Sequence, residues 1–178
     1  MFHIKKITLD DLYPDLLSYF IRNQEIKRCW RKENDEWVLK EISYVENWDT
    51  DLLKEIVAVD LTNCLKSGAF VWGVFDGSDN MIAWATLLSN FFGSSNQYLE
   101  LMQLHVSDEC RRKGIGKNLF ALCAQKARQL GAKKLYISAH PSEEAQLFYK
   151  SIGCVDAVEV NAKIAAYEPY DRQMEFVL

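Results

Sequence analysis

The segment RRKGIGK at residues 111–117 combines four cationic side chains with two glycines in one short turn of chain. Its cations are Arg111, Arg112, Lys113 and Lys117. Gly114 and Gly116 leave backbone N–H groups open to a ligand, just before a stretch with helical periodicity whose dipole favours negative charge at this end. The segment predicts an anion site that suits a pyrophosphate. Glycines that only shape a tight loop beside a solvated basic face are the alternative.

Two common phosphate-binding motifs do not fit this segment. A Walker loop requires a glycine five positions before Gly116, where the sequence has Arg111, and a Ser or Thr after Lys117, where it has Asn118. A dinucleotide-binding fingerprint requires a third glycine at the position of Leu119. The anion site is therefore of another type.

The composition is typical of a single-domain globular protein. The chain has 178 residues, of which 49% are hydrophobic, and a net charge of -4, which argues against a general nucleic-acid binder. Its five cysteines include no CxxC pair, so we expect reduced thiols and no metal site. The first residues lack the apolar core of a signal peptide, and the longest apolar run, MIAWATLL, is too short to span a bilayer. We therefore expect a cytoplasmic protein without nucleic-acid or membrane partners.

Hydrophobic periodicity predicts the elements that position the segment. Apolar runs predict strands at residues 2–8, 98–106, 133–139, 154–160 and 172–178, and a hairpin formed by residues 69–76 and 80–90. Helical spacing predicts helices over residues 10–20, 51–66, 116–130 and 142–152. Residues 24–49 show no clean period. The order of these elements indicates one domain with a mixed α/β sheet.

The same segment resembles part of a known protein family. The pattern R-x-x-G-x-G, formed by Arg111, Gly114 and Gly116 between a strand ending in LHV and an amphipathic helix, resembles the acyl-CoA pyrophosphate loop of the GNAT superfamily of N-acetyltransferases. The later stretches KLYISA and AQLFYKSIGC are similar to a strand of that family and to its helix with Phe-Tyr and a closing Gly. The resemblance covers residues 69–178 well and the first 68 residues only in the order of their elements.

The resemblance implies a fold and a cosubstrate. We expect a mostly antiparallel central sheet of six to seven strands, with splayed central strands and about four flanking helices. Residues 1–178 would then form a single acyl-CoA N-acyltransferase domain, in which residues 69–178 are the cofactor-binding core and residues 1–68 shape the acceptor site. The cosubstrate implied is acetyl-CoA, with no metal.

The resemblance also implies binding roles for single residues. The pantetheine arm would lie beside the strand 98–106, where N–H groups near Leu104 and Val106 hold it and polarise the thioester carbonyl. His105 is expected to form part of the wall of the site. The pyrophosphate would bind the turn formed by Arg111, Arg112, Lys113, Gly114, Ile115, Gly116 and Lys117.

Tyr149 lies in the segment FYK, where the family places a tyrosine near the cofactor sulfur. Donating its phenolic proton to the departing thiolate would be general-acid catalysis, which typically contributes ~10²–10⁴-fold in rate. A tyrosine that only packs beside Phe148 is the alternative. The same helix departs from the family at its start, where many relatives have an Asn that contacts pantetheine. This chain has Ser142 there, after His140-Pro141, so that contact is not carried over.

Glu100 is the candidate base. An acceptor amine attacks only when it is neutral, so the site needs a group that removes a proton. Glu100 lies six residues before Val106, a spacing similar to that of a glutamate in histone-type members of the family. A carboxylate on so apolar a strand should have a raised pKa, which suits a base. A structural Glu paired with a buried cation is the alternative.

The sequence does not identify the acceptor. Four aromatic residues either line a slot for an amine or belong to the core: Trp30, Trp37, Tyr44 and Trp48. Three acids either draw a cation or lie on an exposed hairpin: Glu168, Asp171 and Glu175. We expect transfer of an acetyl group from acetyl-CoA to a primary amine of a small molecule or peptide by direct attack in a ternary complex, and a homodimer is left open. The alternatives are a non-catalytic acyl-CoA-binding or sensing domain and an unrelated nucleotide-binding domain.

Overall fold

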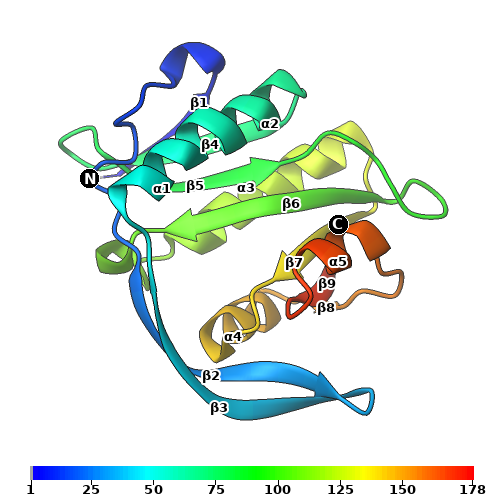
Figure 1. The fold of residues 1–178 in the computed structure, drawn as a ribbon. Coiled ribbons are helices and arrows are strands. Elements are labelled where there is room, and N and C mark those ends of the chain that lie inside the picture. Colours follow the sequence, from blue (N-terminus) through cyan, green and yellow to red (C-terminus); the bar gives the residue numbers. More distant parts are fainter. Residues whose placement is uncertain (1) are drawn as a thin grey trace.

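The computed structural model describes residues 2–178 and places seven strands in one sheet, in the order β1-β4-β5-β6-β7-β9-β8 (Figure 1). These are β1 (His3–Ile7), β4 (Phe70–Phe75), β5 (Met81–Leu87), β6 (Tyr98–Val106), β7 (Lys134–Ala139), β8 (Val155–Asp156) and β9 (Arg172–Val177). Within the described residues only β6 and β7 pair in parallel. The predicted mixed, mostly antiparallel sheet is confirmed. Met1, which the predicted domain includes, lies outside the described residues.

Helices cover both faces of this sheet (Figure 1). α1 (Thr50–Glu55), a π-helical segment (Ile56–Leu61) and α2 (Thr62–Lys66) follow one another without a break on the face that we call the front. α3 (Ile115–Leu130) lies on the opposite face and packs into a separate apolar cluster. The helices predicted over residues 51–66 and 116–130 are confirmed, and the first contains an unpredicted π segment. No helix in residues 2–178 is both long and apolar enough to cross a membrane.

The helix predicted over residues 10–20 is wrong. A 3-10 turn at Leu9–Asp11 ends at Leu12, whose backbone is extended, and Pro14 follows two residues later. A proline disfavours the helical conformation of the residue before it and has no N–H to donate, so a helix cannot continue through this point. The apolar residues of this irregular segment are nevertheless buried on the front face: Leu16, Leu17 and Phe20. Burial alone, without a helix, explains their spacing.

The aperiodic residues 24–49 form a long hairpin that is separate from the main sheet. β2 (Asn23–Glu33) and β3 (Glu36–Asn47) pair in antiparallel register. Asn34 and Asp35 join them with positive φ angles of 48° and 66°, as a two-residue hairpin turn requires. The hairpin runs beside α4 (Glu143–Ser151) and is held there through charged and aromatic side chains (Figure 1). Its strands have no purely apolar face, which is why the sequence shows no alternation.

The C-terminal part differs from the prediction in one element. α4 confirms the predicted helix, and the hydroxyl of Ser142 accepts the N–H of Ala145 at its start. The strand predicted over residues 154–160 is wrong beyond β8, because Val158 is 83% exposed and has no neighbouring strand to pair with in the described residues. The chain instead turns into α5 (Ala162–Tyr167), which the sequence pattern did not indicate.

β6 and β7 pair over only three residues at one end. Tyr98, Leu99 and Glu100 face Lys134, Leu135 and Tyr136. Beyond Glu100, β6 continues along β5 while β7 continues along β9, so the two central strands diverge as the resemblance implies. We call the region between residues 101–106 of β6 and residues 137–139 of β7 the gap. Its open end lies where both strands end.

Candidate active site

The ladder between β5 and β6 turns two backbone N–H groups of β6 toward the gap. Ser107 donates its N–H to the carbonyl of Ile82 at 2.8 Å, so residues 107 and 105 occupy hydrogen-bonded pairs with β5. Because such pairs alternate in an antiparallel ladder, the N–H groups of Leu104 and Val106 point away from β5 and toward β7. A β-bulge at Met102 interrupts the register next to them. These are the two N–H groups that the resemblance assigns to the pantetheine arm.

The loop after β6 presents a run of free backbone N–H groups. Arg112 and Gly114 have left-handed φ angles of 59° and 80°, and Gly114 is the N-cap of α3. Within residues 2–178 the N–H groups of residues 112–117 donate to no acceptor, and the helical bonds begin with Asn118, which donates to Gly114 at 3.0 Å. Successive free N–H groups at a helix N-terminus form an anion-binding concavity. The turn therefore fits a pyrophosphate.

The two glycines of this loop serve different purposes. A Cβ on Gly114 would meet no atom within 4 Å, so this position is open to a ligand, and its positive φ favours glycine. A Cβ on Gly116 would lie 3.3 Å from the ring of Phe148. Gly116 therefore allows close packing between α3 and α4, the helix that carries Tyr149.

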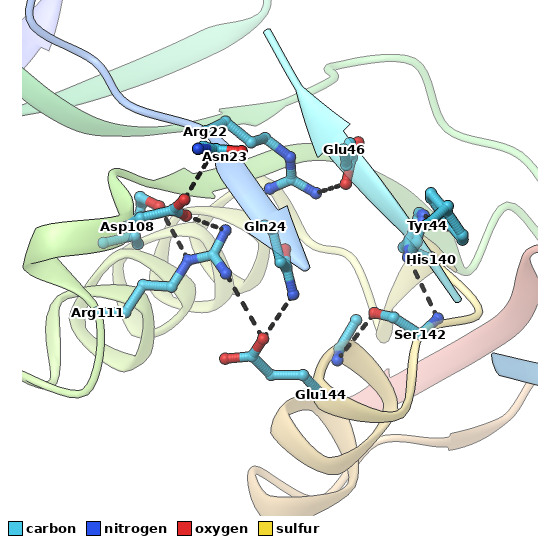
Figure 2. Close-up of polar contacts among 12 residues, drawn as sticks. Arg22, Asn23, Gln24, Tyr44, Glu46, Asp108, Arg111, His140, Ser142 and Glu144 are labelled. Atoms are coloured by element: carbon cyan, nitrogen blue, oxygen red, sulfur yellow. Dashed lines mark hydrogen bonds and ion pairs between the residues drawn. The ribbon is translucent and has the colours of Figure 1, made fainter. Parts of the chain in front are cut away.

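Three of the four cations predicted around this loop are exposed: Arg112, Lys113 and Lys117. Arg111 differs from them. Its guanidinium pairs with Asp108 at 2.8 Å and with Glu144 at 3.5 Å, and its Nε donates to the carbonyl of Val106 at 3.3 Å (Figure 2). The side chain of Arg111 thus joins the end of β6 to the start of α4 and is not a free cation.

Tyr149 packs against the apolar cluster around α3. Its ring lies 5.1 Å from the ring of Phe148, centroid to centroid. Burial, followed by the neighbouring Cys154 and Asp171, raises the pKa of the hydroxyl above its ordinary value, so it is protonated at neutral pH. No hydrogen bond to this hydroxyl is formed within residues 2–178. Its proton is therefore not committed to another protein group.

Glu100 is the last residue of β6 that pairs with β7, so it lies where the gap begins. It is half-buried, and burial raises the pKa of its carboxyl group to about 7. It is close enough to α2 to raise the pKa of the Cys64 thiol. No cation lies beside Glu100 in the described residues, so the ion pair considered as the alternative is not formed. A carboxylate with this pKa can accept a proton near neutral pH.

His105 lies between two tryptophans. Its ring centroid is 4.9 Å from that of Trp48 and 4.8 Å from that of Trp84. Burial, followed by the charges of Arg22 and Arg111, lowers the pKa of His105 to about 3. The ring is therefore neutral and part of a packed aromatic wall, not a group that exchanges protons at neutral pH.

Comparison with known proteins identifies the family. A model described as the acetyltransferase (GNAT) family matches residues 16–154. The chain belongs to the GNAT family of acetyltransferases. A search of curated protein sequences gave no significant match.

Solved structures of acetyltransferases share this GNAT fold. The structure of nourseothricin acetyltransferase aligns over 99% of this chain and 98% of that chain, with a TM-score of 0.69 and 14% identity. A Bacillus anthracis protein named as a streptothricin acetyltransferase, solved with acetyl coenzyme A, aligns over 100% and 99%, with a TM-score of 0.73 and 14% identity. AtaT complexed with acetyl-methionyl-tRNAfMet aligns over 99% and 95%, with a TM-score of 0.62 and 15% identity. At these identities the similarity shows the fold alone, so the acceptor has to be argued from this chain's own residues.

β2 and the residues just before it are bonded to both sides of the gap in this GNAT protein. On the β6 side, the N–H of Ile21 donates to the hydroxyl of Ser107 at 3.0 Å. The N–H of Asn23 donates to the carboxylate of Asp108 at 2.7 Å (Figure 2). On the β7 side, the N–H of Trp30 donates to the carbonyl of Pro141 at 2.8 Å. The hairpin therefore lies beside the open end of the gap, where an acceptor would approach.

The hairpin also carries polar side chains toward this end. Arg22 pairs with Glu46 at 2.5 Å and lies over the ring of Trp48 at 4.9 Å. Tyr44 and the Nε2 atom of His140 are 3.2 Å apart (Figure 2). Arg22 and His140 were not predicted as site residues, because Arg22 lies just before the aperiodic stretch and His140 lies at a strand end. The Asn34-Asp35 turn pair is the sequence signal that could have revealed the hairpin and, with it, Arg22.

The four aromatic residues of residues 24–49 do not share one slot. Trp48 packs on His105 and Tyr44 contacts His140, as described above. Trp30 lies under Lys150 at 4.7 Å and Trp37 under Arg172 at 4.8 Å, so both stabilise the hairpin against α4 and β9. Only Trp48 and Tyr44 remain candidates for the acceptor side.

Two further carboxylates, those of Asp171 and Asp60, are half-buried and have no neighbouring cation in residues 2–178. Burial, followed by the charge of Glu168, raises the pKa of Asp171 to about 6, and Ser138 donates to this carboxylate at 3.2 Å. Burial likewise raises the pKa of Asp60 in the π segment. Glu175, in contrast, pairs with Lys134 at 2.6 Å and has a structural role. No group of three or more His, Cys, Asp or Glu side chains in residues 2–178 is arranged to hold a metal ion.

Proposed function

We propose that this protein transfers an acetyl group from acetyl-CoA to a primary amine of a small molecule or peptide, by direct attack in a ternary complex. The observation that carries this proposal is the unpaired edge of β6. It connects the free N–H groups of the loop at 112–117 to the unpaired carboxylate of Glu100, which lies where the gap begins. A thioester bound along this edge would lie between an anion site and a base.

The cofactor-side roles follow from the exposed groups. We assign the pyrophosphate to the N–H groups of residues 112–117, which include Gly114, Ile115 and Gly116. We assign the neutralising charge to Arg112, Lys113 and Lys117, because Arg111 is already paired. The N–H groups of Leu104 and Val106 would bind the arm and stabilise the charge that develops on the thioester oxygen.

The chemical step requires two proton transfers. The amine nitrogen forms a bond to the carbonyl carbon, and the bond between that carbon and sulfur breaks. Glu100 accepts the proton that the amine loses, directly or through water. Tyr149 donates its phenolic proton to the departing thiolate, and the resulting phenolate regains a proton from solvent.

The acceptor side favours an amine that carries additional positive charge. Asp60, Glu100 and Asp171 are half-buried and have no cation beside them, so a cationic ligand would be attracted to this face. In this proposal residues 1–68 shape the acceptor site through the hairpin and the π segment. Residues 69–178 bind the cofactor, and residues 1–178 act as one acyltransferase domain.

The test is a measurement of free-thiol release from acetyl-CoA over a panel of primary amines of different charge. We expect turnover, with the highest kcat/KM for amines that carry a second positive charge. Acetyl-CoA should also raise the melting temperature, because a ligand that binds only the native form stabilises it by RT ln(1 + [L]/Kd). Tight acetyl-CoA binding without turnover on any amine would replace this proposal with a non-catalytic binding domain.

A further inference from the structure

Gln146 on α4 is fully buried, and only half of its amide group is satisfied. Its Nε2 donates to the carbonyls of Ala139 at 3.2 Å and His140 at 3.0 Å, at the end of β7. These two carbonyls require a donor, which fixes the nitrogen on their side and leaves Oε1 as the free acceptor. Oε1 is buried and has no donor in the described residues. An unsatisfied buried acceptor is destabilising, so such an atom in a native protein is expected to have a partner.

Other buried polar atoms without a hydrogen bond lie at the same end of the gap as Gln146 Oε1. Besides Gln146 Oε1, two buried side-chain atoms in residues 2–178 lack a hydrogen bond or an ion-pair partner: Arg22 Nε and His105 Nδ1. His105 lies near the end of β6, and Gln146 is bonded to the end of β7. Arg22 lies over Trp48, which packs on His105. All three therefore lie around the open end of the gap, where substrates would meet.

The hydroxyl nearest to Gln146 on α4 caps the start of the helix. Ser142 lies one turn before Gln146, and its hydroxyl accepts the N–H of Ala145 at 3.4 Å. Its backbone N–H in turn donates to His140 at 3.2 Å. Gln146 Oε1 is the buried side-chain oxygen of α4 that has no hydrogen bond in residues 2–178, and an acceptor oxygen binds only a donor group.

We propose that Gln146 is a substrate-binding residue, whose Oε1 accepts a hydrogen bond from an N–H group of a substrate bound in the gap. Two sources supply this chemistry: an amide of the pantetheine arm of acetyl-CoA and the acceptor amine. This proposal rests on the proposed function only in placing acetyl-CoA in the gap. Binding measurements test it without turnover, so the two proposals can fail separately.

The test compares Gln146→Met, which has no acceptor oxygen, with Gln146→Glu, which keeps one. A buried Glu is protonated, so it can still donate to one of the β7 carbonyls. If the partner is the pantetheine amide, Gln146→Met raises the Kd of acetyl-CoA by ~10-fold in calorimetry, while Gln146→Glu stays within ~3-fold of the native protein. If the partner is the acceptor, the Kd is unchanged and the KM of the amine rises by ~10-fold in Gln146→Met.

Two controls separate substrate binding from a general structural effect. Adenosine 3′,5′-bisphosphate has no pantetheine arm, so it should bind both variants as it binds the native protein, which also shows that they are folded. Gln129→Met, on the exposed face of α3, should change neither value. If Gln146→Met leaves both the Kd of acetyl-CoA and the KM of the amine unchanged, the proposal is wrong.

A measurement on the native protein avoids reliance on the variants. The side-chain amide signals of Gln146 in a ¹⁵N spectrum should shift when acetyl-CoA or acetyl-CoA with an amine is added. They should not shift with adenosine 3′,5′-bisphosphate. Signals that respond to no substrate would overturn the proposal, because the amide would then have no ligand partner.

Discussion

The cofactor side and the acceptor side of the gap are built from different kinds of contact. On the cofactor side, residues 112–117 are consecutive, and their free N–H groups follow from two left-handed backbone conformations and the start of α3. On the acceptor side, the polar contacts join distant residues, as when Arg22 meets Glu46. Consecutive residues form a site through local geometry, whereas distant pairs require the whole fold. A variant on one side should therefore change the binding of one substrate and leave the other unchanged.

The largest expected effect lies where the two sides meet, at Tyr149. Tyr149→Phe should lower kcat by ~10²–10⁴-fold, because no phenolic proton reaches the departing thiolate. The Kd of acetyl-CoA should stay the same, since the hydroxyl supports no protein hydrogen bond in residues 2–178. Thiol release and calorimetry measure the two quantities. An unchanged rate would show that Tyr149 is not the general acid.

The next effect concerns the acceptor side. The kcat/KM for the amine should rise as the pH passes about 7, because Glu100 accepts a proton only when its carboxyl group is ionised. Glu100→Gln should lose this rise and be ~100-fold slower at pH 8. Glu36→Gln, at the exposed first residue of β3, is the matched control and should keep the native profile. A native profile in Glu100→Gln would mean that another group is the base.

The cofactor side should respond to the loss of charge in the loop. Replacing Arg112 and Lys113 together by Gln should raise the KM of acetyl-CoA by ~10-fold and leave kcat unchanged, because phosphate contacts bind ground and transition states alike. The same change at Arg128, in the last turn of α3, and at Lys133, just after that helix, is the control for net charge. An increase in the KM of the amine would show that the two sides are not independent.

Glu100 also predicts a pH-dependent stability. Its pKa is raised from 4.5 to about 7, so the folded protein holds this proton more tightly than the unfolded chain and loses stability as the pH rises from about 4.5 to about 7. Glu100→Gln should therefore unfold with a free energy about 1–3 kcal/mol above that of the native protein at pH 8, with no gain at pH 4. Urea unfolding at the two pH values measures this difference. An equal gain at both values would contradict the assignment to ionisation.

The smallest effect is expected at the outer contact of the hairpin. Arg28 and Glu143 form an exposed pair with contacts of 2.6 Å and 2.9 Å. Arg28→Gln should lower the free energy of unfolding by less than about 1 kcal/mol, as is usual for a surface ion pair. The KM of the amine should rise by less than ~5-fold, and that of acetyl-CoA should not change. A change in the KM of acetyl-CoA alone would show that the hairpin affects cofactor binding and not amine binding.

Sequence-based prediction is accurate for features formed by consecutive residues and poor for features formed by distant residues. The glycine turn before α3 and α3 itself were predicted well as backbone elements, because a glycine pattern and a 3.6-residue period are properties of consecutive residues. The helix over residues 10–20 was wrong, because apolar residues around Pro14 are buried without being helical. The hairpin was missed, because its contacts with α4 are charged and aromatic and leave no apolar alternation.

Residue types and their local order were enough to predict the glycine turn before α3, the amphipathic helix behind it, the mixed sheet and the family. The tertiary structure alone decided that Arg111 is paired, that Glu100 has no partner where β6 leaves β7, and that Gln146 keeps a free oxygen beside the gap. These properties depend on which distant groups come within hydrogen-bonding range and on how much water they lose. Neither the contacts between distant groups nor their loss of water can be predicted from spacing along the chain.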